Sequence, residues 1–149
     1  MLWNDVYQVF ELDGSLRDIL VRETSITDWE KLLSLSLQLG KISYRCDGED
    51  AILSDCAAEL LSNKEHAHCM MADLGGPVAN THFFSCEEIE LDTDPRQINS
   101  QASLDKVLNL CSKLSLVLER DVAITEENHP EEILLSHSFQ RCSWQIGSQ

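Results

Sequence analysis

Histidine and cysteine residues gather in the middle of the chain, at His66, His68, Cys69, His82 and Cys86. Imidazole and thiolate groups are ligands that zinc prefers, and His66 and His68 would share one face of a strand because alternate side chains point the same way. The spacings match no common zinc module, since neither a C-x-x-C nor an H-E-x-x-H pair occurs. We therefore expect no bound metal or other cofactor, and keep His66, His68 and Cys69 as the alternative for a metal site.

Carboxylates offer a second kind of metal chemistry. Asp92 and Asp94 lie two residues apart, and Asp47, Glu49 and Asp50 cluster after an expected strand, so either group could hold magnesium or calcium. Neither group fits a calcium-binding loop, where ligands alternate with a glycine at a fixed place and a closing glutamate. A solvated acidic face is the better interpretation, because charged side chains commonly line protein surfaces.

Nucleophilic catalysis has no sequence signature in this chain. None of the six cysteines lies in a glycine turn that opens a helix, a context that lowers a thiol pKa, and no serine lies in a G-x-S-x-G motif. The Gly75-Gly76-Pro77 segment is followed by no lysine and no helix cap, so it predicts a turn and not a phosphate cradle. The sequence predicts a non-enzymatic protein, and a small metal-dependent or cysteine-dependent enzyme remains an alternative.

The net charge is the strongest signal in the composition. The 149 residues include 26 acidic and 11 basic ones, which gives a formal net charge of −15 at pH 7. Such a charge attracts cationic partners and repels nucleic acid and anionic membrane surfaces. Much of it lies in two segments, residues 87–94 and 126–132. A protein with a basic surface is therefore the expected partner.

The first acidic segment predicts a ladder of carboxylates. If residues 87–94 form a strand, Ile89 and Leu91 face the core, and acidic side chains project from the other face at roughly 7 Å intervals. The second segment is expected in a loop that could extend the same surface. The expected partner-binding residues are Glu87, Glu88, Glu90, Asp92, Asp94, Glu126, Glu127, Glu131 and Glu132. The alternative is that the ladder protects a sheet edge from aggregation.

Length, apolar content and cysteine usage bound the class of protein. A chain of 149 residues with 43% hydrophobic residues can form one domain with an ordinary core. The N-terminus lacks the basic and apolar regions of a secretory signal, and no apolar run is long enough to span a membrane. Six scattered cysteines are expected as buried free thiols. We expect a single cytoplasmic domain over residues 1–149, with a frayed tail from about residue 145; its oligomeric state stays open.

The first quarter of the chain predicts a β-hairpin and a helix. Alternating apolar residues favour a hairpin over residues 4–23, with Gly14 in its turn. Thr27 and Glu30 have the spacing of a capping box, which predicts a helix start, and Gly40 suits the position just past its end. The buried stripe of this helix is expected at Trp29, Leu32, Leu33 and Leu37.

The remaining elements follow from apolar periodicity. Amphipathic helices are expected over residues 52–61 and 102–119. Strands are expected at residues 41–46, 66–72, 82–84, 89–91, 122–125 and 133–135. This order predicts an α+β fold, a single-domain sandwich in which about three helices pack on one face of a mixed or antiparallel sheet.

Three segments, residues 6–19, 84–92 and 124–128, carry a resemblance. In size, acidity and order of elements the chain resembles the small acidic immunity proteins of bacterial polymorphic-toxin and interbacterial competition systems. The resemblance implies a non-enzymatic, antitoxin-like inhibitor that binds a cognate toxin and blocks its active site, in many cases the basic cleft of a nuclease. The alternative is an acidic adaptor or regulatory module that binds another basic protein.

Overall fold

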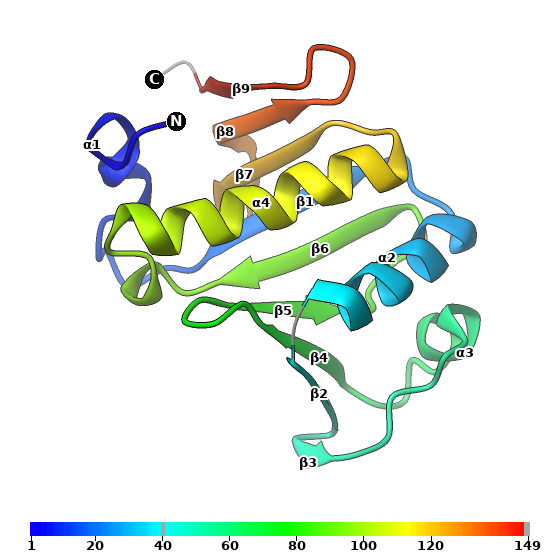
Figure 1. Ribbon diagram of the computed structural model, residues 1–149. Coiled ribbons are helices and arrows are strands. Elements are labelled where there is room, and N and C mark those ends of the chain that lie inside the picture. Colours follow the sequence, from blue (N-terminus) through cyan, green and yellow to red (C-terminus); the bar gives the residue numbers. More distant parts are fainter. Residues whose placement is uncertain (40, 148–149) are drawn as a thin grey trace.

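The computed structural model describes residues 1–39 and 41–147. These residues form an α+β fold built on one antiparallel sheet of nine strands in the order β3-β2-β4-β5-β6-β1-β7-β8-β9. Figure 1 shows helices α2 (Ile26–Leu39) and α4 (Gln101–Leu118) lying across the same face of this sheet. The predicted class is confirmed, and of the two predicted sheet types the antiparallel one is correct. The sheet has more strands than the sequence predicts.

The other elements are short. The remaining helices are α1 (Trp3–Val6) and α3 (Ala57–Ser62), and the 3-10 turns are η1 (Tyr7–Phe10) and η2 (Pro95–Gln97). The strands are β1 (Arg17–Arg22), β2 (Lys41–Cys46), β3 (Glu49–Asp50), β4 (His68–Asp73), β5 (Val78–His82), β6 (Glu88–Thr93), β7 (Val122–Glu126), β8 (His129–Ser138) and β9 (Ser143–Ile146). Within the described ranges, no helix is long and apolar enough to cross a membrane.

The core lies between the sheet and the two long helices. Ile19 of β1, Ile89 of β6 and Trp29 of α2 are fully buried. The predicted stripe of α4 is confirmed, since its members are all buried: Leu104, Val107, Leu108, Cys111, Leu114 and Leu118. In α2 the prediction was wrong for Leu37, which is 67% exposed. The apolar faces of α2 and α4 thus cover one face of the sheet.

The first half of the predicted hairpin is wrong. Residues 3–10 form α1 and η1, because Val6 and Phe10 are spaced four apart and both reach the core. The buried Arg17 side chain fixes the segment that follows. Its guanidinium donates to the carbonyl oxygens of Val9 at 2.6 Å and Glu11 at 3.3 Å. β1 is therefore free to pair with β6 and β7.

The helix starts also differ from the prediction. Asp28 Oδ2 accepts hydrogen bonds from the amide and hydroxyl of Ser25, so these two residues stabilise the start of α2 where Thr27 and Glu30 were expected. Glu30 instead accepts a hydrogen bond from the Ala57 amide at 2.8 Å, at the first residue of α3. The expected role of Gly40 lies outside the described residues.

Several other boundaries are shifted. The helix predicted from residue 52 begins at Ala57, and Ile52 is 96% exposed. Of the strand predicted at 82–84, only His82 lies in a strand, as the last residue of β5, which begins at Val78. The predicted break at residues 75–77 is confirmed, since Gly75 and Gly76 both have positive φ angles in the turn between β4 and β5.

The C-terminal region is more ordered than the sequence predicts. The strand expected at 133–135 is the middle of β8, and β9 continues to Ile146, past the point where a frayed tail was expected. Trp144 of β9 donates from its indole nitrogen to the Ser112 hydroxyl on α4 at 3.2 Å. The six cysteines are all free, as predicted, but the prediction that they are buried is correct only for Cys111, and Cys86 and Cys142 are exposed.

Candidate functional site

The sheet face turned away from α2 and α4, here called the outer face, carries a group of carboxylates. Side chains alternate along β6, so Ile89 and Leu91 point into the core, and Glu88, Glu90 and Asp92 point to the outer face. In β1, Asp18 lies directly opposite Asp92 of β6. We call four side chains on these two strands the outer-face carboxylates: Asp18, Glu88, Glu90 and Asp92.

Asp92 is buried, and its two oxygens have separate partners on β5. Asn80 donates to Oδ1 at 2.7 Å, and His82 Nε2 lies 2.9 Å from Oδ2. The hydrogen bond to Asp92 raises the pKa of His82 above its ordinary value, although burial of the ring works against this. The His82 ring also stacks on Phe84, with 5.2 Å between the ring centroids. Asp92 is therefore an anchored carboxylate that favours the protonated form of the neighbouring His82.

Asp18 and Glu90 are in a less favourable environment. Burial raises the pKa of Asp18, and the nearby charges of Asp92 and Glu127 raise it further. Burial also raises the pKa of Glu90, followed by repulsion from Asp18 and Glu88. The shifts of both residues have the same origin, because each carboxylate loses solvent and gains like-charged neighbours. An approaching cation would relieve this repulsion.

Arg22 links the two acidic segments. Its guanidinium Nε lies 3.7 Å from the Glu88 carboxylate, and its Nη2 donates to the Pro130 carbonyl oxygen at 2.8 Å. Pro130 belongs to a bulge in β8, because β7 pairs Glu126 with His129 and its neighbour Thr125 with Ile133.

The bulge corrects the prediction for the second acidic segment. The segment is no loop after the last strand, since it spans the end of β7, a turn and the start of β8. Glu131 and Glu132 are exposed in the bulge, directly after the Pro130 carbonyl that Arg22 binds. The sequence therefore predicts that the two acidic segments lie on one surface, but it does not predict the bulge in β8 that brings the second segment to Arg22.

Four further predicted site residues are not among the outer-face carboxylates, although the charge of one of them, Glu127, acts on Asp18. Asp94 follows β6, caps η2 and pairs with Arg96 at 2.7 Å, and this arginine lowers the pKa of Asp94. Glu127 accepts a hydrogen bond from the Leu16 amide at 2.9 Å. Glu87 and Glu126 are exposed at strand ends. Of the predicted ladder, Glu88, Glu90 and Asp92 share a strand face, and Asp94 does not extend it.

The three alternative metal ligands are not brought together. His66 Nδ1 lies 2.6 Å from Asp47 Oδ2. His68 uses both ring nitrogens, Nδ1 at 2.5 Å from the Tyr44 hydroxyl and Nε2 at 3.0 Å from the Asn63 carbonyl oxygen. Cys69 is the next residue along β4 and therefore points to the other face of the sheet.

Cys69 has a histidine and an aspartate close by. It lies directly opposite His82, which binds Asp92, so the three residues follow one another across β4, β5 and β6. Burial raises the pKa of the Cys69 thiol, and the charge of Asp92 raises it further. A catalytic cysteine needs the opposite shift, because the thiolate is the nucleophile. This electrostatic environment works against a role for Cys69 in nucleophilic catalysis.

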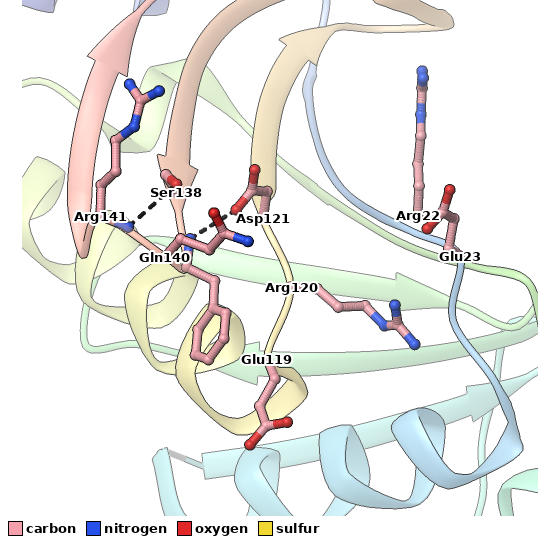
Figure 2. A pocket seen from close by; sticks show the side chains of 9 residues that line it. Arg22, Glu23, Glu119, Arg120, Asp121, Ser138, Gln140 and Arg141 are labelled. Atoms are coloured by element: carbon pink, nitrogen blue, oxygen red, sulfur yellow. Dashed lines mark hydrogen bonds between the residues drawn. The ribbon is translucent and has the colours of Figure 1, made fainter.

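A polar pocket of about 480 Å³ lies at the end of the sheet near the β8–β9 turn. Figure 2 shows the guanidinium groups of Arg22, Arg120 and Arg141 pointing in different directions around it. Acidic side chains stand between them, and Asp121 accepts a hydrogen bond from the Phe139 amide at 2.7 Å. The arginines therefore do not converge on one point where an anion could bind.

Four residues of this surface cannot be found from single sequence segments: Asp18, Arg22, Asn80 and His82 as a partner of Asp92. One signal in the sequence points to Asp18, a charged residue inside the apolar run of β1. The contacts of the others depend on strand order. Their partners lie on β6 and β8, at distances along the chain that no local pattern specifies.

The fold and the site define an α+β protein with a carboxylate-rich outer sheet face. Comparisons of the chain with protein-family models, with curated proteins and with solved structures find no match.

The His82–Asp92 pair predicts a pH-dependent stability. Because the pKa of His82 in the folded protein lies above the ordinary 6.5, its contribution is complete below pH 6.5 and is lost as the pH rises through the raised value. Glu90 and Asp18 lie near His82 and also have raised pKa values. Their titration likewise lowers the free energy of unfolding as the pH rises, but at lower pH than that of His82. The free energy of unfolding should therefore fall between about pH 6 and about pH 8.

Urea denaturation at these two pH values checks this. The fall should be smaller in His82→Gln and unchanged in the control His129→Gln, which replaces an exposed histidine. An equal pH dependence in wild type and His82→Gln would contradict the assignment.

Proposed function

We propose that this chain is a non-enzymatic immunity protein, which binds a cognate bacterial toxin in the cytoplasm and blocks it through an acidic surface. The observation that supports this most is the meeting of both acidic segments at Arg22, beside the outer-face carboxylates. A basic active-site cleft is the matching partner, since complementary potentials steer association and penalise wrong partners.

The position of β6 argues against the alternative that the carboxylates guard a sheet edge. β6 lies between β5 and β1 and is paired on both sides. Acidic residues discourage aggregation where a strand has unpaired backbone groups, and an interior strand has none to protect. Carboxylates with raised pKa values on such a strand carry a cost to the fold, which is expected of a binding surface.

The test is coexpression with the product of the gene directly upstream. We expect a stable complex and protection of the cells from growth arrest. The complex should weaken with added salt, because exposed charges are screened within about 8 Å at physiological ionic strength.

Charge-neutralising variants connect the test to the surface. The double variant Glu88→Gln/Glu90→Gln should weaken the complex, whereas Asp5→Asn/Asp55→Asn removes the same charge from exposed sites elsewhere and should not. If neither a complex nor protection is observed, the immunity function is wrong. Binding of a basic protein without protection would favour the adaptor function instead.

A further inference from the structure

A second group of side chains with ligand chemistry lies at the end of β2 and in the loop before β4. Cys46, Asp47 and His66 each offer one atom, a sulfur, a carboxylate oxygen and an imidazole nitrogen, and these atoms all lie within 4.8 Å of one another. A tetrahedral zinc ion with bonds of about 2.0–2.3 Å places its ligand atoms roughly 3.5 Å apart. Asp47 and His66 are exposed, so small side-chain rotations can close the difference.

The backbone holds two of these residues side by side. The Asp47 amide donates to the Ala67 carbonyl oxygen at 2.8 Å, and the Ala67 amide donates to Asp47 Oδ1 at 2.8 Å. Asp47 has a left-handed φ of 53° in the turn between β2 and β3, next to Gly48 at 84°. This turn sends the Asp47 carboxylate toward His66, where Oδ2 lies 2.6 Å from Nδ1. The two side chains are therefore neighbours before any ion binds, and their hydrogen bond must open for both to bind the same ion.

We propose that Cys46, Asp47 and His66 form a binding site for a divalent transition metal, with zinc as the best match. Thiolate and imidazole ligands favour zinc over magnesium or calcium, which prefer oxygen alone. On binding, the Cys46 thiol releases its proton to solvent as the sulfur–metal bond forms. The sequence offers His66, His68 and Cys69 as the alternative metal ligands, and only His66 belongs to the site proposed here.

Three protein ligands leave a fourth position. Asp47 and His66 both line a surface pocket of about 450 Å³, so this position faces the pocket and takes water or a donor atom of a small ligand. His68 lines the same pocket, but both its ring nitrogens are engaged by Tyr44 and Asn63. Such an open site is the arrangement found in zinc sites that bind an exogenous ligand.

The test is titration of the full-length, metal-free protein with Zn²⁺, followed by dialysis and elemental analysis. We expect one zinc per chain. Cobalt in place of zinc should give the intense near-ultraviolet absorption of a thiolate-to-cobalt charge transfer. Loss of a single outer partner of a metal ligand typically costs 10–100-fold in affinity, so Cys46→Ser, Asp47→Asn and His66→Gln should each weaken zinc binding by more than about tenfold.

Two controls separate ligation from structural damage. Asp47→Asn keeps an oxygen that can accept the Ala67 hydrogen bond and tolerates the left-handed backbone, so its circular dichroism should match wild type. Cys142→Ser removes an exposed thiol elsewhere and should bind zinc normally. The proposal is overturned if wild type retains no stoichiometric zinc, if Cys46→Ser and Cys142→Ser bind equally well, or if the cobalt form lacks the thiolate band.

Discussion

Replacing Trp29 with alanine should lower the free energy of unfolding by about 3–5 kcal/mol, the usual cost of removing a buried large aromatic side chain. Trp29 is fully buried, and its ring lies 5.0 Å from that of Phe83. Its indole nitrogen donates to the Ser85 carbonyl oxygen at 3.0 Å, a bond that alanine cannot replace. Since domains of this size have about 5–15 kcal/mol of stability in total, this change removes a large share of it.

The effect should reach the acidic surface as well. Trp29 holds Ser85, and Thr24 holds the next two residues. The Thr24 hydroxyl donates to the Cys86 carbonyl oxygen and the Thr24 amide donates to the Glu87 carbonyl oxygen, both at 2.9 Å. These contacts fix the chain that enters β6 at Glu88. Loosening them should make the outer-face carboxylates less well positioned.

Urea denaturation followed by circular dichroism measures the predicted loss. Leu37→Ala is the matched control, because Leu37 lies on the same helix but is 67% exposed. It should change the free energy of unfolding by less than about 0.5 kcal/mol. Equal effects of the two substitutions would show that α2 does not pack through Trp29.

The long helix α4 and the core strand β6 could be predicted because their signals are local. The stripe of α4 repeats at helical spacing over its whole length, and Ile89 and Leu91 alternate with charged residues in β6. Each of these patterns has one buried face and one polar face, so periodicity alone identifies the element and its orientation.

The errors arise where distant residues override a local pattern. Residues 4–12 alternate like a strand, but Val6 and Phe10 are buried from short helical turns that Arg17 fixes from β1. The bulge in β8 is contacted by Arg22, which lies 108 positions from Pro130 in the chain. No periodicity specifies such contacts, because they depend on which strands become neighbours.

In the candidate site, too, some features could be predicted from the sequence and others could not. The sequence predicts that Glu88 and Glu90 share a face, since this follows from strand alternation. It does not predict that Asp92 is buried between Asn80 and His82, or that Asp18 lies opposite it, because both depend on the pairing of β6 with β5 and β1. The electrostatics of the surface are therefore a property of the fold.

Replacing Glu90 with lysine should abolish most of the binding to a basic partner while leaving the fold intact. Like charges placed together across an interface cost several kcal/mol, which corresponds to a loss of affinity of about a hundredfold or more. The folded chain should accept the lysine, because the pKa of the native Glu90 carboxyl is raised first by burial and then by repulsion from Asp18 and Glu88, and a lysine turns that repulsion into attraction. The affinity for the partner should therefore fall, while the free energy of unfolding does not fall with it.

The neutral variant Glu90→Gln separates recognition from structure. It removes the repulsion from Asp18 and Glu88 without adding a positive charge, so the free energy of unfolding at neutral pH should stay equal or rise slightly. Affinity for the partner, measured by calorimetry on the coexpressed complex, should fall less than in Glu90→Lys. A purely structural role of Glu90 predicts the reverse, a loss of stability in both variants and unchanged affinity for whatever protein remains folded. If Glu90 lowers the free energy of unfolding but raises the affinity for the partner, its role is in binding and not in folding.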